Sequence, residues 1–240
     1  MLELFEVGVS VGPRTVLSSL DFSLAEGQVL GIVGSSPNER AALLRVLTGE
    51  TKPRPGSAKL GGQELWRQPL AELARRCAYL PQRLAFDLDA SVLEVVQGGR
   101  APHRGRESRR MSQEIAELAL DFTGVWALAS LPYIDLSQGQ QRRVQLARGF
   151  AQIWQPVADG GRLLLLDEAE SAPEPSQQNQ LLASARRFAT RGVAVVLVLR
   201  DLKLAACHTD QLLVLGQGRM LAYAATPEVL RTGPAPVPAL

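Results

Sequence analysis

The sequence predicts an α/β fold with a mainly parallel sheet, and three patterns support this prediction. Short apolar runs typical of strands alternate with segments whose apolar residues recur at helical spacing. Residues 193–199 are apolar almost throughout, which indicates a strand covered on both faces. Residues 162–166 form a second such run, followed by two carboxylates. At 240 residues the chain is long enough for one large domain, or for one domain with a subdomain.

The first part of the chain is rich in strand patterns. Residues 2–9 and 15–24 read as strands on either side of a Gly-Pro turn, and residues 29–33 read as a buried strand. Beyond them we expect a helix over 41–47, a turn-rich stretch over 51–62, a proline-initiated helix over 69–75 and a strand over 77–80.

The sequence pattern changes from strand-like to helical between residues 84 and 135. Ser91 and Glu94 have the spacing of a capping box, and residues 112–122 repeat apolar residues at helical spacing. No strand-like run occurs in this stretch. We therefore interpret residues 84–135 as a helical subdomain inserted into a core made of residues 1–83 and 136–240.

Strands and helices alternate again after the insert. We expect helices over 137–152, 177–190 and 202–207, and strands over 162–166, 193–199, 211–215 and 219–223. Gln217 and Gly218 predict a hairpin between the last two strands. Residues 232–240 are expected to form a loose tail.

Composition excludes several classes of function. The net charge of +2 gives no argument for a nucleic-acid partner. Cys77 and Cys207 lie outside any metal-ligand spacing, so we expect two small buried residues. No apolar run approaches the roughly 20 residues that span a bilayer, and residues 1–10 lack a signal pattern. We expect a soluble, cytoplasmic chain, and a membrane-embedded partner stays open.

The stretch after the strand at 29–33 stands where a phosphate-binding loop is expected. Strand, tight loop and helix form the context of the pattern G-x-x-x-x-G-K-[ST]. Of that pattern this chain keeps the first glycine, Gly34. The positions that follow hold Ser35, Ser36, Pro37, Asn38, Glu39, Arg40, Ala41 and Ala42.

Two carboxylates, Asp167 and Glu168, follow the apolar run at 162–166. Ligands of open α/β folds bind at the carboxyl edge of the sheet, where such residues lie. In a nucleotide site Asp167 would reach Mg²⁺ through water and Glu168 would polarise the attacking water. The alternative is a strand that simply ends in polar residues.

Residues 136–144, LSQGQQRRV, resemble the LSGGQ-type signature of ATP-binding-cassette (ABC) proteins, which opens a helix. The Ser137 hydroxyl and nearby N–H groups would then point at a phosphate. A helix that merely has Ser137 as its N-cap is the alternative. The family's motifs also occur in the family's order. They are the loop at Gly34, Gln82, Ser137 with Gly139, the pair Asp167 and Glu168, a D-loop-like Ser171 and Ala172, and Arg200 in the place of the family's histidine.

The resemblance covers residues up to about 230 and carries specific implications. It implies a P-loop NTPase (RecA-like) core with an antiparallel β part and a helical subdomain that docks on a membrane permease. ATP and Mg²⁺ are the implied cofactors, with Asp167 and Gln82 at the metal and Glu168, Gln82 and Arg200 at the catalytic positions. Residues 34–42, Ser137 and Gly139 would contact nucleotide. The implied partners are integral-membrane permease subunits and a second cassette, at the cytoplasmic face of the cell membrane.

Two finer stretches resemble a subgroup of this family. Residues 99–103, GRAPH, look like a stretch of importers for hemin, siderophores and cobalamin, and residues 152–156 are similar to hemin-importer subunits. His103 itself fits either a chemical role or a surface-loop position.

The loop departs from the family's pattern in ways that predict impaired ATP handling. Pro37 removes an N–H group from a loop that binds through such groups. Glu39 brings a carboxylate toward the phosphates, and two unit charges about 5 Å apart repel by roughly 3 kcal/mol at an effective dielectric near 20. Arg40 is bulkier than lysine, and Ala41 and Ala42 lack the hydroxyls of the family pattern.

Gln138 and Arg200 also replace residues of the family pattern, a signature glycine and the histidine. Four interpretations follow from these departures. The chain is a weak ATPase subunit of an importer, a non-catalytic partner of a competent cassette, a nucleotide-free homodimer on a permease, or a protein whose arginine-containing loop binds nucleotide in a new way.

Overall fold

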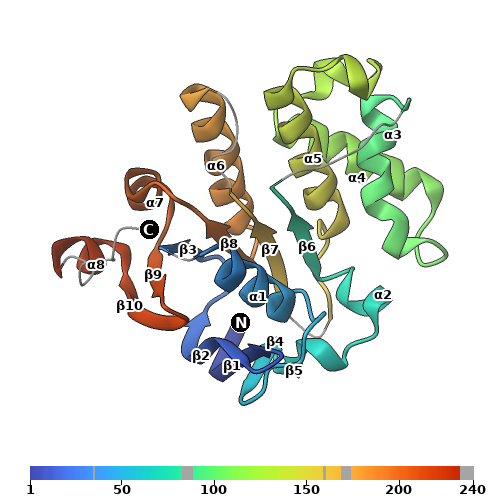
Figure 1. Cartoon of the computed structure of the whole chain (residues 1–240). Coiled ribbons are helices and arrows are strands. Elements are labelled where there is room, and N and C mark those ends of the chain that lie inside the picture. Colours follow the sequence, from blue (N-terminus) through green and yellow to red (C-terminus); the bar gives the residue numbers. More distant parts are fainter. Residues whose placement is uncertain (35, 83–88, 159–160, 169–173, 233–240) are drawn as a thin grey trace.

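The computed structural model describes residues 1–34, 36–82, 89–158, 161–168 and 174–232, whose strands form two sheets (Figure 1). The smaller sheet has the order β2-β1-β4-β5 and is antiparallel. The larger sheet has the order β10-β9-β3-β8-β7-β6, in which β9, β3, β8, β7 and β6 run parallel and β10 is antiparallel at the edge. The predicted α/β class with a mainly parallel central sheet is confirmed.

The elements follow one another along the chain with short connections. The strands are β1 (Leu2–Val11), β2 (Arg14–Leu24), β3 (Val29–Val33), β4 (Ser57–Leu60), β5 (Gln63–Glu64), β6 (Cys77–Leu80), β7 (Arg162–Leu166), β8 (Val193–Val198), β9 (Gln211–Gly216) and β10 (Arg219–Ala225). The α-helices are α1 (Pro37–Leu47), α2 (Leu70–Leu73), α3 (Val92–Gln97), α4 (Arg109–Phe122), α5 (Gln138–Gln152), α6 (Pro175–Ala189), α7 (Leu202–His208) and α8 (Thr226–Thr232). The 3-10 helices are η1 (Leu65–Arg67), η2 (Gly98–His103), η3 (Trp126–Leu128) and η4 (Tyr133–Asp135).

The central sheet is covered on both faces, as the apolar runs predict. Successive residues of a strand point to opposite faces, so Val195 of β8 joins one apolar cluster and Val196 joins the other. Both side chains are fully buried. On one side the cluster includes residues of α1 and of the antiparallel sheet; on the other it includes residues of α5 and α6.

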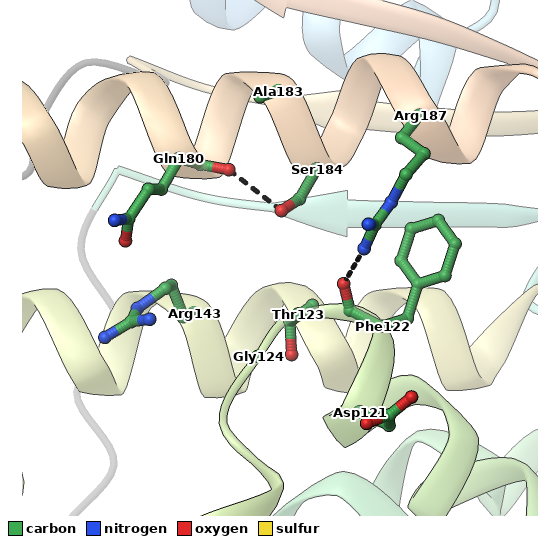
Figure 2. A pocket seen from close by; sticks show the side chains of 9 residues that line it. All are labelled: Asp121, Phe122, Thr123, Gly124, Arg143, Gln180, Ala183, Ser184 and Arg187. Carbon is green, nitrogen blue, oxygen red and sulfur yellow. Dashed lines mark hydrogen bonds between the residues drawn. The ribbon is translucent and has the colours of Figure 1, made fainter.

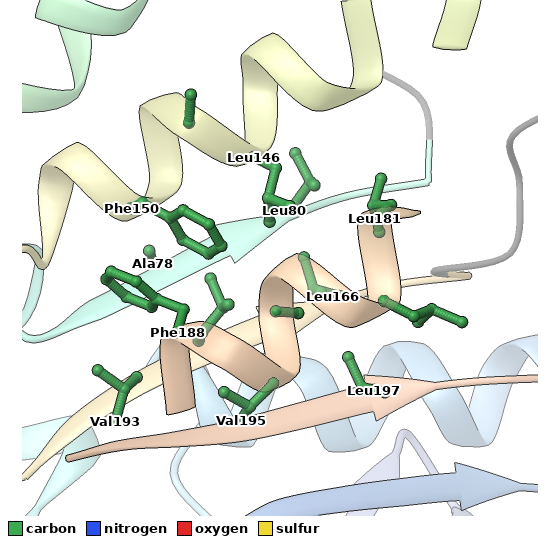
Figure 3. Close-up of a cluster of buried hydrophobic side chains, with 14 of the residues drawn as sticks. Ala78, Leu80, Leu146, Phe150, Leu166, Leu181, Phe188, Val193, Val195 and Leu197 are labelled. Atoms are coloured by element: carbon green, nitrogen blue, oxygen red, sulfur yellow. The ribbon is translucent and has the colours of Figure 1, made fainter. Parts of the chain in front are cut away.

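Helices α5 and α6 cover the second face through a group of aromatic rings (Figure 3). The rings of Phe150 and Phe188 stack with centroids 4.0 Å apart. Phe122, at the end of α4, meets both rings edge-on at 5.6 and 5.8 Å. This contact ties the end of α4 to the two helices that cover the sheet.

The described residues 89–135 form helices and turns, with one isolated bridge between Ser91 and Pro132. Ser91 caps α3 through the predicted capping box with Glu94. Figure 1 shows α3 and α4 gathered beside α5, away from the antiparallel sheet. The predicted helical character of this stretch is therefore present, and its role in docking stays a prediction.

Several local predictions need correction. The helix expected over 41–47 begins at Pro37, because proline is favoured in the first helical turn. Strands β4 and β5 fall in or beside the stretch expected to be turn-rich, and α8 was not predicted. Cys77 is buried as expected, whereas Cys207 is exposed on the short helix α7. The tail beyond residue 232 lies outside the described residues.

None of the helices in the described part of the chain is both long enough and apolar enough to cross a membrane.

Candidate functional site

Four of the predicted site residues lie at one edge of the central sheet. Gln82 comes two residues after β6, Asp167 and Glu168 follow β7, and Arg200 comes two residues after β8. The carboxyl ends of these parallel strands meet at a common edge. The structure joins the four side chains to Arg40 of α1 in one cluster of ion pairs and hydrogen bonds.

The phosphate-loop position is instead the start of a helix. Ser36 is the N-cap of α1 and Pro37 occupies the first turn. The backbone N–H of Glu39 donates to the Ser36 hydroxyl (3.3 Å), and the N–H of Ser36 donates to the Glu39 carboxylate (2.9 Å). This reciprocal pair is a capping box. Pro37 therefore costs the helix no hydrogen bond, since a first-turn N–H has no partner within the helix.

Glu39 does not project toward the place of a phosphate as a free charge. Its second carboxylate oxygen accepts a hydrogen bond from the N–H of Gly218, 2.6 Å away at the tip of the β9–β10 hairpin. The side chain is buried, and both of its oxygens are engaged. An anion that belongs to the chain thus lies at the positive end of the α1 dipole, where an external anion would bind.

The other predicted loop residues frame this helix start. Gly34 has φ +79, and a Cβ there would lie 2.8 Å from the carbonyl oxygen of Leu215, so this glycine is required by the turn after β3. Asn38 and Ala41 are exposed, and Ala42 is buried against the core. Ser35 lies outside the described residues.

Arg40 joins α1 to both carboxylates at the end of β7. Its Nε lies 3.2 Å from Oδ1 of Asp167, and its Nη2 lies 2.8 Å from Oε1 of Glu168. The three side chains are 12%, 13% and 4% exposed. The contact with Asp167 is an ion pair without hydrogen-bond geometry, and Oδ1 has no hydrogen-bond donor within the described structure.

Glu168 has two further partners. Arg200 donates to one carboxylate oxygen and the amide nitrogen of Gln82 donates to the other. Arg200 is itself 66% exposed, so its charge is reached by water. Glu168 also has φ +46, a strained conformation for a residue with a side chain. Three partners around its carboxylate hold the side chain in place despite that strain.

Burial sets the proton affinity of the groups at this edge. The pKa of the Asp167 carboxyl is raised by burial and by the neighbouring Glu168, against the lowering effect of Arg40 and Arg142. The pKa of Tyr79 is raised to about 12 by burial first and then by the charge of Asp167. Tyr79, Arg40 and Asp167 line a pocket of about 290 Å³ beside α1.

The donor set does not fit a magnesium–triphosphate group. Mg²⁺ prefers oxygen ligands, whereas Asp167 and Glu168 already face the guanidinium of Arg40. Ala41 has no hydroxyl to add, and the carboxylate of Glu39 takes the Ser36 N–H at the α1 N-terminus. In the described part of the chain, no group of three or more His, Cys, Asp or Glu side chains could hold a metal ion.

The signature segment is a second capped helix start. Ser137 is the N-cap of α5 and forms a capping box with Gln140, at 3.3 and 2.9 Å. Ser137 is exposed, whereas Gly139 is buried where a Cβ would meet the side-chain amide of Gln177. No contact between Ser137 or Gly139 and the Arg40 cluster is recorded for the described residues.

Arg142 connects this helix to the sheet edge and was not among the predicted site residues. It donates to the carbonyl oxygens of Pro81 and Asp167, the latter at 3.0 Å. Burial lowers the pKa of its guanidinium. The sequence shows an arginine five residues after Ser137, but the carbonyl groups to which it donates could not be predicted from the sequence. Gly218 was missed as well, because it lies 179 residues from Glu39.

Residues 99–103, which resemble a stretch of importers for hemin, siderophores and cobalamin, hold the helical subdomain against the end of α5. Arg100 is buried, pairs with Glu107 and donates to the carbonyl oxygen of Ala151. His103 lies 2.8 Å from the carbonyl oxygen of Gln152, and burial lowers its pKa. The surface-loop interpretation of His103 is therefore wrong, since the ring is buried against the end of α5.

Comparison with known proteins places these features in context. Residues 17–171 match the sequence model of a family described as ABC transporter. The hemin import ATP-binding protein HmuV of Gloeobacter violaceus is 41% identical over 239 residues, which cover 97% of this chain and 86% of that protein. The protein of the same name from Pseudomonas entomophila is 40% identical over 230 residues, with 96% and 89% covered.

A solved structure matches as well. It is cbiO1 from Clostridium perfringens, part of the ABC transporter complex cbiONQ, with a TM-score of 0.83 and 19% identity, covering 96% of this chain and 90% of that one. At this identity the match shows the fold alone, and it agrees with the predicted P-loop NTPase fold.

Proposed function

The chain belongs to the ABC transporter family, and from this premise we propose that it is the cassette subunit of an importer for hemin or a related iron chelate, with impaired handling of ATP. Relatives about 40% identical across nearly the whole chain carry the name hemin import ATP-binding protein, which supports the substrate class. The subunit would act with integral-membrane permease subunits and a second cassette at the cytoplasmic face of the cell membrane.

The ion pairs of Arg40 carry the proposal of impaired ATP handling. A metal-bound triphosphate would require Asp167 and Glu168 to turn from Arg40 toward the metal. Both carboxylates are largely buried, and a buried charge that loses its partner costs about 3–5 kcal/mol unless another charge takes the partner's place. Nucleotide binding would have to supply this free energy before any net affinity appears.

Glu39 opposes the phosphates independently of Arg40. Its carboxylate would meet a phosphate group at the α1 N-terminus, and two unit charges about 5 Å apart repel by roughly 3 kcal/mol at an effective dielectric near 20. Moving Glu39 away would break its hydrogen bonds to Ser36 and Gly218. Two separate features of the same helix therefore favour weak binding of ATP.

A second candidate function is a non-catalytic subunit that pairs with a competent cassette. The exposed N-terminus of α5 favours it, because the Ser137 hydroxyl is exposed and the capping box engages the N–H groups of Ser137 and Gln140 but not those of the two residues between them. A second cassette with an intact phosphate loop that co-purifies with this chain would support this function. Persistent isolation of the chain without such a partner would count against it.

The test is a titration of the purified chain with a fluorescent ATP analogue, with and without Mg²⁺. The matched variant restores the family's loop through Pro37→Gly, Glu39→Gly, Arg40→Lys, Ala41→Ser and Ala42→Thr. We expect weak, Mg²⁺-independent binding by the natural chain. The restored variant should bind about 100-fold more tightly with Mg²⁺, which corresponds to about 2.7 kcal/mol.

Hydrolysis gives an independent measurement. Robust Mg²⁺-dependent ATPase activity in the natural chain, abolished by Glu168→Gln, would overturn the proposal of impaired handling. An unchanged affinity in the restored variant would point instead to Arg200 or Gln138 as the limiting residue.

A further inference from the structure

A pocket of about 480 Å³ lies away from the Arg40 cluster, where α4, α5 and α6 meet (Figure 2). The end of α4 contributes Phe122 and its neighbours, α5 contributes Arg143, and α6 contributes Gln180 and Arg187. Neither the family resemblance nor the nucleotide site explains why these polar side chains gather here. The volume falls within the range of small-molecule sites.

Helix α6 presents a polar stripe to this pocket. Gln180, Ser184 and Arg187 stand four and three residues apart, which places them on one face of the helix. Ser184 is satisfied by the carbonyl oxygen of Gln180 at 2.8 Å. The side-chain amide of Gln180 makes no hydrogen bond within the described structure, so its donors are available to a ligand.

Arg143 faces the stripe from α5 and lacks an acceptor. Its side chain is partly buried, and its Nε is fully buried without a hydrogen-bond partner in the described part of the chain. A buried donor left unpaired destabilises a protein, so such groups normally meet an acceptor from protein, water or ligand. Because Nε is closed to solvent, a ligand in the pocket would meet the guanidinium through its two Nη groups, and a carboxylate is suited to them because it accepts two hydrogen bonds side by side.

Arg187 supplies a second cation at the other end. Its guanidinium lies 4.0 Å above the ring of Phe122 and donates to that residue's carbonyl oxygen. These contacts use one face and one donor of the group. Figure 2 shows the guanidinium groups of Arg143 and Arg187 at opposite ends of the pocket.

We propose that this pocket binds a small dicarboxylate, with one acidic group at Arg143 and the other at Arg187. Two separated guanidinium groups are complementary to a molecule with two acidic groups, which a single phosphate does not provide. Gly124 and Ala183 also line the pocket and add little side-chain volume, which leaves space for a short methylene chain. Asp121 also lines the pocket; it and Arg187 are both exposed, so water screens the repulsion by Asp121 and the attraction by Arg187 alike, and Arg143 is the more buried of the two cations.

The test uses the purified full chain and a series of straight-chain dicarboxylates from malonate to suberate, at matched ionic strength. Calorimetric titration should find one favoured length, and that compound should raise the thermal unfolding midpoint. Butyrate, which has one carboxylate, serves as the control ligand and should bind at least tenfold more weakly. Inorganic phosphate should bind as weakly as butyrate.

Variants locate the site. Arg143→Gln should weaken binding of the favoured dicarboxylate at least tenfold. The affinity of Arg143→Lys should lie between those of Arg143→Gln and the natural chain, because lysine keeps the positive charge but lacks the two parallel N–H donors of the guanidinium. Gln180→Ala should weaken binding less. Arg109→Gln is the matched control, since it removes one exposed arginine outside the pocket and should leave binding unchanged.

Three outcomes would overturn the proposal. They are no dicarboxylate binding at 20 mM (about the highest practical concentration for a specific weak site), equal binding of butyrate, or equal weakening by Arg109→Gln and Arg143→Gln. If Arg143→Gln does not fold, the Lys and Gln180→Ala variants still decide the question. The result does not depend on ATP handling.

Discussion

The two helix starts of this chain, at α1 and at α5, use the same local device and present different surfaces. Ser36 with Glu39 caps α1, and Ser137 with Gln140 caps α5, each through a complete capping box. The third residue is an acid in α1 and a neutral amide in α5. In α1 that acid is also buried against Gly218, whereas the cap of α5 is exposed.

The difference shows that a capping box does not by itself decide whether a helix N-terminus is open to an anion. Both helices have a dipole that favours negative charge at this end. In α1 the negative charge is Glu39, which is part of the chain and hydrogen-bonded on both oxygens. In α5 the box is neutral, so its N-terminus keeps its attraction for an external phosphate.

The largest expected effect comes from breaking the ion pairs beside the α1 start. Arg40→Met keeps much of the side-chain volume but leaves Asp167 without its ion-pair partner and Glu168 with one fewer partner. We expect the free energy of unfolding at pH 7 to fall by about 3 kcal/mol, since a buried charge loses its partner. Urea denaturation of the variant and the natural chain measures this change.

The same variant has a pH dependence with a definite sign. Burial already raises the pKa of Asp167, and removal of Arg40 takes away an opposing influence. A carboxyl whose folded pKa is raised is destabilising when charged and regains stability as it is protonated. The difference in the free energy of unfolding between Arg40→Met and the natural chain should therefore become smaller as pH falls from 7 toward the pKa of Asp167. Arg45→Met, an exposed arginine on the same helix, is the control, and equal midpoints for both variants would refute the role given to Arg40.

Two reciprocal substitutions exchange the acid of the α1 capping box, Glu39, and the amide of the α5 capping box, Gln140. Glu39→Gln removes the charge but keeps one acceptor oxygen, so either the N–H of Ser36 or the N–H of Gly218 loses its acceptor and faces the amide NH2 group. We expect about tenfold tighter binding of the fluorescent ATP analogue, which corresponds to about 1.4 kcal/mol, because the repulsion disappears. The free energy of unfolding should fall by about 1–3 kcal/mol, since one of these two N–H groups is left without its acceptor.

Gln140→Glu is the reciprocal change. It should stabilise the chain by about 0.3–1 kcal/mol through the α5 dipole, and it should leave the affinity of the isolated chain for the analogue unchanged. If a competent partner cassette is present, this variant should weaken ATP binding at the shared site. Equal effects of the two exchanges on the isolated chain would mean that the helix starts do not differ as described.

Much of the frame was predictable from local pattern, because strands β3, β7 and β8 carry uninterrupted apolar runs. The α5 cap was predictable too, since Ser137 stands directly before a helical pattern. The start of α1 was predicted wrongly although its local signals were present. Ser36 and Glu39 have capping-box spacing and Pro37 favours a first turn, but the resemblance to a phosphate loop outweighed them.

The chemistry of the site depends on contacts that no local pattern contains. Glu39 meets Gly218 across 179 residues, and Arg40 meets Glu168 only because α1 packs beside the end of β7. The sequence identified Glu39 and Arg40 as unusual and could not show that they are satisfied internally. Their burial and their partners decide whether they repel a phosphate or replace it.

A further effect, visible only at high pH, concerns Tyr79, which lies beside the Arg40 cluster. Its pKa is raised to about 12 by burial and then by the charge of Asp167. Between its ordinary value near 10 and this raised value the unfolded chain loses the tyrosine proton first. Stability is therefore fully present below pH 10 and is lost as pH rises toward 12. Tyr79 is 40% exposed, so we discount two pKa units to about 1 kcal/mol.

Tyr79→Phe removes this titration and should lose less stability than the natural chain between pH 9 and pH 11, as measured by urea denaturation at both pH values. Asp167→Asn is the matched second variant, because it removes the charge that, together with burial, raises the pKa of Tyr79. In that background the benefit of Tyr79→Phe should be smaller. Parallel pH profiles for the natural chain and Tyr79→Phe would mean that the Tyr79 hydroxyl is open to water, and that the edge beside α1 is less closed than the buried carboxylates require.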